Sequence, residues 1–315
     1  MLNALTIDLE DWFQVSNLEH LIPYGSWGEC ASRLASNTRR LLALLDRCGV
    51  RATFFVLGWN AARHPGLVRE VEQAGHEIAS HGYGHRLVYE LTPERFAQDL
   101  ARAETAIGEA CGASPRAYRA PSFSVTARSL WACQVLAEGG YELDSSVFPI
   151  LHERYGLQAA PRLPHRVTLD GRGSLLEAPP STVRYLGRNF PFAGGAYFRL
   201  LPYPAARHFC RRLNRRGEPI VFYLHPWELD PEIPRFRLSP FRRLRTYANL
   251  DQTEPRMERL LKDFRFGPLS EALAQWRKTS ALPEWDPAMC CPQAGGAGPS
   301  ASSTVSALSG SGRLE

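Results

Sequence analysis

Residues Asn37–Gly58 read NTRRLLALLDRCGVRATFFVLG, a helix pattern followed directly by a strand pattern. The leucines of the first part recur at helical spacing, and Gly49 is a suitable residue to end the helix. The apolar run Arg51–Gly58 has the composition expected of a buried strand. A helix that leads into such a strand is the building unit of a parallel sheet.

The same alternation extends over the first 150 residues. Strands are predicted at Leu2–Leu9, His76–Gly82, Arg116–Ser124 and Gly140–Phe148, and helices at Pro65–Ala74, Thr92–Ala110 and Thr126–Glu138. Thr92 and Pro93 suit the cap and the first turn of their helix. The pattern predicts a parallel sheet with helices outside it, either a barrel or an open doubly wound sheet.

The second half is less regular. Residues 151–204 are rich in Pro and Gly and are predicted to form an irregular insertion with short strands. The alternation resumes with a helix at Pro204–Asn214, a strand at Pro219–Trp227 and a helix at Thr253–Asp263. Between 294 and 312, 17 of 19 residues are Ala, Gly, Ser, Thr or Pro, which cannot bury a core. We therefore expect one domain over residues 1–280 and a disordered tail over 281–315.

Composition narrows the class of protein. Lys and Arg number 37 and Asp and Glu 32, a small excess that does not call for nucleic acid. The seven cysteines form no Cys-x-x-Cys pair, which argues against a disulfide scaffold and favours a reducing compartment. The sequence shows no signal peptide and no membrane-spanning stretch. We expect a soluble, cytoplasmic protein, for which contact with a membrane surface through its arginine-rich stretch stays open.

Polar residues lie toward the carboxyl ends of five predicted strands or just beyond them. They are Asp8, Glu10 and Asp11 for the first strand, then His81 and His85, Arg119, Asp144 and His225. Because active sites on parallel sheets lie at the carboxyl ends of the strands, these residues are candidates for a common site.

Two of these groups together favour a metal. His81 and His85 are four residues apart with glycines between them, so both imidazoles can converge on one ion, although surface or core histidines would also explain them. Three carboxylates at the exit of a buried strand repel one another, and a cation would relieve this, although acids also begin many helices. Two histidines and one carboxylate with an open position form the catalytic zinc pattern.

Two further residues suit acid–base chemistry. The proline two residues after Arg119 restricts the backbone there and so helps to fix the position of the arginine. Arg119 could pair with a carboxylate, or it could be an ordinary surface arginine. His225 stands before Pro226 and Trp227, where partial desolvation can bring its pKa into the catalytic range. A core histidine with a satisfied hydrogen bond is the alternative.

Taken in order, these motifs resemble those of the polysaccharide deacetylases, the NodB-homology or carbohydrate esterase family 4 enzymes. The five matching stretches are Thr6–Asp11, His81–His85, Arg119–Phe123, Asp144–Ser146 and Leu224–His225. The Asp-x-Glu-Asp-Trp opening, the stretch Tyr223–Glu228 and residues 249–264 further resemble a subfamily found beside exopolysaccharide gene clusters. That subfamily carries an extra C-terminal region, here about 228–280.

The resemblance implies a distorted (β/α) barrel and a divalent metal, usually zinc, on His81, His85 and one acid. Strand alternation places Glu10 on the same face as Asp8, whereas a strand that ends at Leu9 would let Asp11 turn inward. As the carboxylate ligand, Asp11 is slightly preferred, and Glu10 is the alternative that stays open. Gly82 replaces the family's Ser or Thr and so removes a hydrogen bond that would steady the loop.

The resemblance also implies roles for three residues: Asp8 as general base, Arg119 as the residue that orients it, and His225 as general acid. The implied reaction is hydrolysis of N-acetyl groups on amino sugars of a polysaccharide or its precursor, with release of acetate. An allantoinase-like hydrolase of small amides and a non-catalytic glycan-binding relative are the alternatives, and the presence of Asp8 and His225 favours catalysis. Five aromatic residues of the insertion could line a glycan groove or belong to the core: Tyr185, Phe190, Phe192, Tyr197 and Phe198.

Overall fold

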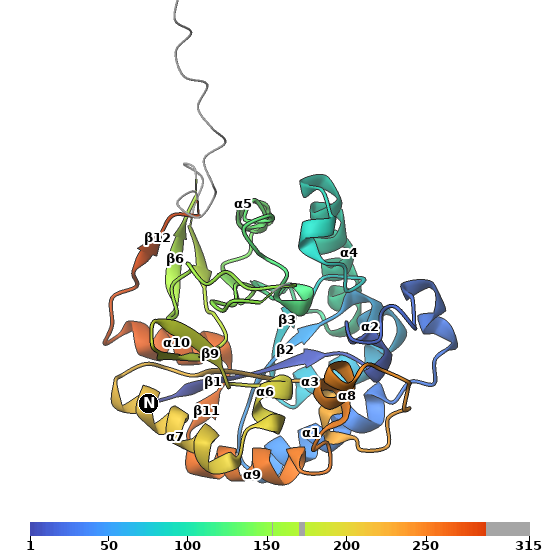
Figure 1. Ribbon diagram of the computed structural model, residues 1–315. Helices are drawn as coiled ribbons and strands as arrows, with labels where there is room; N and C mark the ends of the chain where they lie inside the picture. The colour runs from blue at the N-terminus through green and yellow to red at the C-terminus, as the bar shows by residue number, and fades with distance from the viewer. Residues whose placement is uncertain (153, 170–173, 288–315) are drawn as a thin grey trace, which may run out of the picture.

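Strand β1 (Asn3–Leu9) is buried along its whole length and has parallel neighbours on both sides, as its apolar sequence predicts. The computed structural model describes residues 1–152, 154–169 and 174–287. Seven strands run parallel in the order β10-β1-β2-β3-β4-β5-β7 (Figure 1). Their bounds are β2 (Thr53–Val56), β3 (Glu77–Ser80), β4 (Ala117–Tyr118), β5 (Leu143–Asp144), β7 (Ser174–Glu177) and β10 (Val221–Leu224).

Short strands extend this sheet. β6 (His165–Thr168) pairs antiparallel with β7, β12 (Glu284–Trp285) pairs with β6, and β11 (Phe266–Gly267) pairs with β1. A separate hairpin consists of β8 (Thr182–Tyr185) and β9 (Arg188–Pro191).

Helices lie around the outside of the sheet (Figure 1). They are α1 (Leu34–Arg47), α2 (Gly58–Arg63), α3 (Pro65–Gln73), α4 (Pro93–Cys111), α5 (Ala132–Glu138), α6 (Gly195–Leu200), α7 (Tyr203–Arg215), α8 (Pro240–Tyr247), α9 (Thr253–Asp263) and α10 (Leu269–Arg277). Short 3-10 turns occupy Trp12–Gln14, Tyr24–Glu29, Val88–Glu90, Pro121–Phe123 and Pro226–Leu229. No helix among the described residues is long and apolar enough to cross a bilayer.

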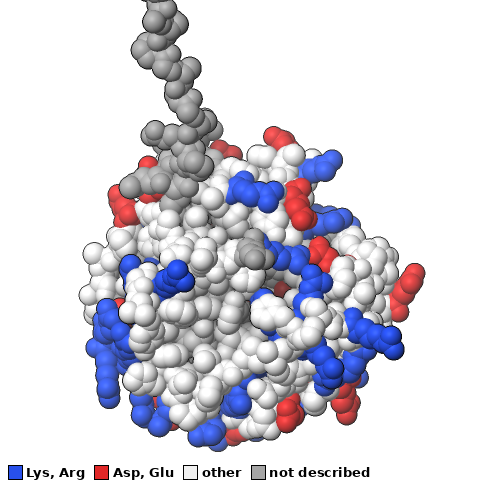
Figure 2. Space-filling model, viewed as in Figure 1, with Lys and Arg blue, Asp and Glu red and all other residues white. Residues whose placement is uncertain are grey.

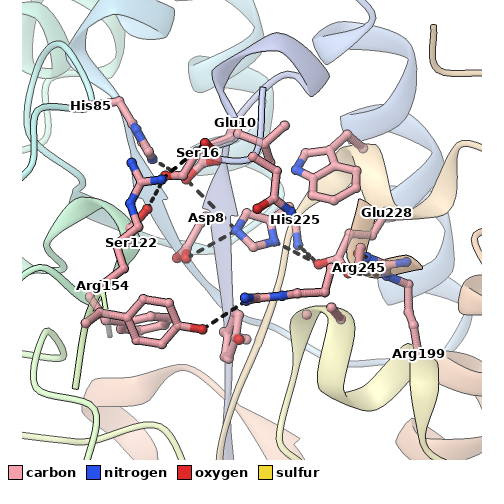
Figure 3. Close-up of a pocket in the computed structure, with 18 of the residues that line it drawn as sticks. Asp8, Glu10, Ser16, His85, Ser122, Arg154, Arg199, His225, Glu228 and Arg245 are labelled. Carbon is pink, nitrogen blue, oxygen red and sulfur yellow. Dashed lines mark hydrogen bonds and ion pairs between the residues drawn. The ribbon is translucent and has the colours of Figure 1, made fainter. Parts of the chain in front are cut away.

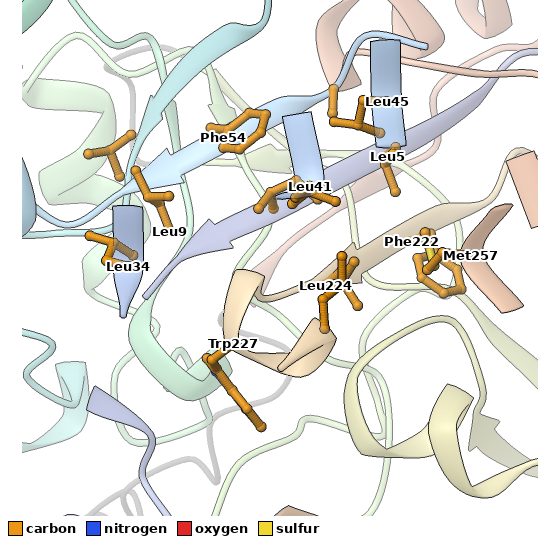
Figure 4. Packing of buried hydrophobic residues seen from close by; sticks show 14 of the residues in the cluster. Leu5, Leu9, Leu34, Leu41, Leu45, Phe54, Phe222, Leu224, Trp227 and Met257 are labelled. Atoms are coloured by element: carbon orange, nitrogen blue, oxygen red, sulfur yellow. The ribbon is translucent and has the colours of Figure 1, made fainter. Parts of the chain in front are cut away.

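The largest core cluster joins β1, β2 and β10 to the helices outside them. Leu41 and Leu45 of α1 pack with Leu5 and Phe54 of the strands, and all four side chains are fully buried (Figure 4). Figure 4 also shows Phe222 of β10 beside Met257 of α9. The leucine spacing of Asn37–Cys48 thus forms the apolar face that the helix needs to cover the sheet.

The barrel closes between β7 and β10 through Ser181. Its N–H donates to the carbonyl of Val221 at 3.0 Å, and its Oγ accepts from the N–H of Val221 at 2.9 Å. The predicted distorted (β/α) barrel is confirmed, and the open doubly wound sheet is excluded.

The irregular insertion differs from its prediction in one respect. Strand β7, within residues 151–204, belongs to the barrel itself and pairs with β5 through Leu176 and Glu177. A short strand was expected there, but only the pairing partners of β7 identify it as part of the barrel.

The ordered chain also continues past the predicted limit at residue 280. Trp285 of β12 is buried and its ring meets His165 edge to face, with centroids 5.3 Å apart. Within the predicted tail of 281–315, the described residues 281–287 thus include a short strand whose buried Trp285 packs on the barrel. Residues 288–315 of the predicted tail lie outside the described residues.

Two glycines, Gly194 and Gly195, let the insertion pack directly against Tyr223 near the end of β10. The carbonyl of Ala193 accepts a hydrogen bond from the N–H of Tyr223 at 3.1 Å. A Cβ on Gly194, whose φ is +137°, would lie 2.1 Å from the Tyr223 carbonyl oxygen, and one on Gly195 would lie 2.9 Å from the Tyr223 ring. Only glycine permits this approach, which brings α6 beside the strand end that carries His225.

Candidate active site

The carboxyl ends of the parallel strands surround a cavity of about 130 Å³. Asp8, Glu10, His85 and His225 are among its lining residues and point toward one another in Figure 3. The structure therefore brings these four residues, which were predicted at separate strand ends, to one cavity.

Arg119 lies directly behind Asp8. It is fully buried, and its guanidinium donates to Asp8 Oδ1 at 2.7 Å and to Thr6 Oγ1 at 2.8 Å. On its other side it donates to Ser145 Oγ at 2.8 Å and to the Ser145 carbonyl at 3.2 Å. Its charge also sits 4.2 Å above the Phe55 ring. With so many partners the guanidinium has one position, and the Asp8 carboxylate is held with it.

Asp144 does not line the cavity and acts behind Arg119 instead. Its Oδ1 accepts from the N–H of Ser145 at 2.9 Å and from the hydroxyl of Ser146, so it orders the turn that holds the arginine. Asp144 and Glu177 are both fully buried. Burial raises the pKa of Asp144 to about 6, and burial together with the Asp144 charge raises the pKa of Glu177 well above its usual range. Burial and their mutual repulsion therefore disfavour both carboxyl groups being ionised together.

Glu10 lies between the two histidines. Its Oε1 is 3.0 Å from His81 Nε2 and 3.2 Å from His85 Nε2. His81 donates its Nδ1–H to the Arg119 carbonyl at 2.7 Å, so Nε2 is the ring nitrogen that faces Glu10. Burial raises the pKa of Glu10, but the nearby His85 and His225 and its hydrogen bonds outweigh this and hold the pKa well below its usual range.

These three side chains fit a divalent cation. Their ligand atoms all lie within 4.8 Å of one another, and two imidazoles with one carboxylate are a donor set that zinc accepts. Glu10 and His81 are almost fully buried, so an unpaired charge here would be costly without a counter-charge.

Asp11, the preferred acid in the sequence analysis, points away from the histidines. Its carboxylate accepts hydrogen bonds from Ser32 Oγ at 2.6 Å and from the backbone N–H groups of Arg33 and Leu34 at 3.0 and 3.2 Å. It thus caps the start of α1. The N–H of Glu10 donates to the Asp8 carbonyl at 2.8 Å, and this tight turn keeps residues 8 and 10 on the cavity side. The structure therefore places Glu10, and not Asp11, beside His81 and His85.

The loop between the histidines is held by a residue that the sequence analysis did not identify. Asp99 of α4 accepts from the N–H groups of Tyr83 at 2.8 Å and Gly84 at 3.4 Å. A Cβ on Gly82, whose φ is +71°, would lie 2.7 Å from Asp99 Oδ2. The loop therefore does not need the missing Ser or Thr, because a carboxylate from a neighbouring helix steadies it.

His225 is oriented by a second buried pair. Its Nδ1–H donates to Glu228 Oε1 at 2.7 Å, and Glu228 Oε2 accepts from Arg199 Nε at 2.6 Å. Arg199 also donates to the carbonyls of Ala248 and Arg245 at 2.5 and 2.6 Å. Neither Glu228 nor Arg199 was predicted as a site residue. Glu228 could have been found from its place three residues after His225, whereas no sequence pattern indicated Arg199.

The pKa of His225 reflects these neighbours. Burial lowers it, but the negative charges of Glu10, Glu228 and Asp8 outweigh burial and raise the pKa to about 9. Its Nε2 lies 3.7 Å from Asp8 Oδ2 across the cavity. The cavity thus holds a carboxylate that can accept a proton opposite an imidazolium that can donate one.

Of the five aromatic residues of the insertion, two line a groove beside this cavity. These are Phe190 and Tyr197. Phe192 and Phe198 are buried in the core, and Tyr185 is exposed on the β8–β9 hairpin.

Two family models match the chain. Residues 24–143 match the model described as polysaccharide deacetylase, and residues 145–274 match a domain of unknown function, DUF3473. His81, His85 and Arg119 lie in the first match, whereas His225, Glu228 and Arg199 lie in the second. The site therefore draws on both regions, and on Asp8 and Glu10, which precede the first.

Curated relatives match a part of the chain. A peptidoglycan-N-acetylglucosamine deacetylase of Bacillus cereus is 29% identical over 98 residues, which are 31% of this chain and 36% of that protein. A chitooligosaccharide deacetylase of Bradyrhizobium is 36% identical over 101 residues, 32% of this chain and 43% of that protein. The matched part is less than half the length of either relative.

Two solved structures share the fold over most of the chain. A Mycobacterium smegmatis protein assigned to the polysaccharide deacetylases has a TM-score of 0.59 at 24% identity, covering 89% of this chain and 91% of its own. The Puue allantoinase has a TM-score of 0.57 at 16% identity, covering 88% and 90%. At these identities the likeness concerns the fold alone.

Proposed function

We propose that this chain, whose residues 24–143 match the polysaccharide deacetylase model, hydrolyses N-acetyl groups of amino sugars in a polysaccharide or its precursor, releasing acetate. One observation carries the proposal. Asp8 and the His225 imidazole face each other across the cavity at 3.7 Å, beside the group of Glu10, His81 and His85. Amide hydrolysis needs a base for water and an acid for the leaving amine, and the cavity offers both.

Glu10, His81 and His85 would hold a divalent cation, and the imidazole-rich donor set favours zinc. When bound, such a cation polarises an acyl carbonyl and acidifies water. Asp8 accepts the proton of the attacking water, and Arg119 keeps its carboxylate aimed at that water.

His225 acts at the other end of the reaction. An amine is a poor leaving group unless it is protonated, so the imidazolium gives its Nε2 proton to the sugar nitrogen as the carbon–nitrogen bond breaks. Glu228 holds the ring through Nδ1, which leaves Nε2 as the nitrogen that faces the substrate. The products are acetic acid, which ionises to acetate in solution, and a free amino sugar. Return of the proton from Asp8 to His225, 3.7 Å away, restores both groups for the next turnover.

Both matched regions contribute to this chemistry, which supports residues 1–280 as one catalytic unit with a family-specific region from about 228. The resemblance of Tyr223–Glu228 to the exopolysaccharide-associated subfamily supports an exopolysaccharide as the glycan. The cysteines of the described residues are free thiols, which supports the cytoplasm as the compartment.

Acetate release from N-acetylglucosamine oligomers by the purified, zinc-loaded protein tests the proposal. We expect turnover by the wild type, none by Asp8→Asn with its metal retained, and normal turnover by the surface control Glu72→Gln. Turnover of allantoin in place of the oligomers would establish the small-amide alternative. Oligomer binding without turnover by the metal-loaded wild type would establish the non-catalytic one.

A further inference from the structure

Exposed apolar side chains gather in one groove next to the catalytic cavity. Among the described residues, nine large apolar side chains are more than a third exposed, and four of them line this groove of about 380 Å³. They are Leu151, Phe190, Leu200 and Phe241, which are between 37% and 77% exposed. They come from four separate segments: the start of the insertion, β9, α6 and α8. Such a concentration on a folded surface marks a binding site more often than chance exposure.

The groove adjoins the catalytic cavity. His152, Ala196 and Arg245 lie between the two spaces and line both. Arg245 extends into the catalytic cavity near His225 and Glu228 in Figure 3. A ligand that reached from one space into the other would pass beside Arg245.

The charged side chains that line the groove are positive. Arg188 and Arg245 line the groove, whereas no Asp or Glu of the described residues does. Arg245 donates to the Tyr155 hydroxyl at 3.0 Å, and within the described ranges no carboxylate lies within salt-bridge distance of Arg188 or Arg245. Arg242 and Arg243 are exposed on α8, and Figure 2 shows Lys and Arg side chains gathered over that helix. The arginines favour an anionic group, and the groove beyond them favours an apolar one.

We infer that the groove binds the apolar chain of a lipid-linked substrate, in which a long isoprenoid or acyl chain is joined through phosphate to an N-acetylated glycan. The sugar occupies the catalytic cavity, the phosphate lies by Arg245 and Arg188, and the chain lies along Leu151, Phe190 and Phe241. The placement of the sugar in the catalytic cavity rests on the proposed function, whereas the placement of the apolar chain rests on the groove alone.

Binding of farnesyl phosphate, measured by calorimetry, tests the groove without any catalytic step. The wild type should bind farnesyl phosphate more tightly than farnesol and far more tightly than inorganic phosphate. The double variant Leu151→Ser/Phe241→Ser should bind it at least about tenfold more weakly, since two exposed side chains of the wall lose their apolar contact. Leu186→Ser is the matched control, because Leu186 is fully exposed but lines neither space, and it should bind like the wild type.

Three results would overturn the inference. They are equal affinity of the double variant and the wild type, no binding by the wild type, and conversion of a wild-type dimer to a monomer by the double substitution in analytical ultracentrifugation. The last would show that a second copy of the chain covers the groove. Acetate release from a short soluble oligomer should be equal in the wild type and Leu186→Ser. Its absence in the wild type would count against the proposed function, while groove-dependent binding of farnesyl phosphate would still stand.

Discussion

His225 donates its Nδ1–H to Glu228, three residues further along the chain, at 2.7 Å. The same carboxylate oxygen accepts the backbone N–H of His225 at 3.1 Å, so the ring is fixed from two sides. Glu228 is completely buried, and the equally buried Arg199 offsets its charge. His225 can therefore hold a proton on Nε2 within a desolvated cavity, which an isolated histidine would resist.

Glu228→Gln should lower kcat/KM on an N-acetylated oligomer by about 10²-fold, at the lower end of what acid catalysis contributes. The amide keeps an acceptor for Nδ1–H but loses the charge that helps raise the pKa of His225. The alkaline limb of the pH–rate profile should therefore move to lower pH. Glu232→Gln, which changes an exposed carboxylate nearby, is the control. A lower rate with an unmoved alkaline limb would assign Glu228 a merely structural role.

His225→Ala should affect amide and ester substrates unequally. An amine leaves only when protonated, whereas an activated phenolate leaves without help, so the variant should lose about 10²–10⁴-fold more activity on the N-acetyl sugar than on an activated acetate ester. Comparing kcat/KM on the two substrates measures this difference. Equal losses would mean that His225 positions the substrate.

Glu10→Gln and Asp11→Asn should differ in metal content although the residues are adjacent. Glu10 contacts both histidines, so its variant should lose about one ion per chain, as should His81→Ala. Asp11 caps α1, so its variant should keep the metal and lose about 1 kcal/mol of stability. Elemental analysis and thermal melting separate the two effects. Metal loss in Asp11→Asn alone would return the ligand role to Asp11.

Stability should fall as the solution is made acidic. Burial lowers the pKa of His165 from its ordinary 6.5 to about 4, against a smaller opposing effect of the Leu163 carbonyl. The folded state therefore binds fewer protons than the unfolded state, and stability that is complete above pH 6.5 decreases as pH falls toward 4. The loss for this residue is up to about 3 kcal/mol.

Urea unfolding at pH 7.5 and pH 5 checks this expectation. His165→Gln should reduce the difference between the two pH values, although His76, whose pKa is also lowered to about 4, maintains part of it. The exposed His208→Gln should leave the difference unchanged. A difference of wild-type size in His165→Gln would contradict the assignment.

Two truncations should differ in melting temperature. A chain that ends at Pro287 removes only the Gly- and Ser-rich end, whose composition cannot offset the entropy of ordering it, so melting should be unchanged. A chain that ends at Ser280 also removes Trp285, and should melt several degrees lower because burial of a large apolar side chain contributes about 1.5–3 kcal/mol. A large fall already at Pro287 would show that the end of the chain docks on the barrel.

Much of the barrel could be predicted because its signals are local. The helix predicted at Thr253–Asp263 matches α9 in both bounds, and β1 differs from its prediction by one residue. The convergence of Asp8, Glu10, His81 and His225 was also predictable, since parallel strands bring their carboxyl ends together whatever their order in the sheet.

The helices and strands, and the polar residues at the strand ends, could therefore be predicted from sequence alone, because each depends on a pattern of a few neighbouring residues. Tertiary structure decided which acid faces the histidines, since hydrogen bonds from Ser32 and Leu34 draw Asp11 away. It also decided the partner of Glu228, because Arg199 lies 29 residues earlier and no local pattern connects the two. Closure of the barrel by Ser181 on Val221 depends likewise on contacts between segments distant in sequence, which form only when the whole chain has folded.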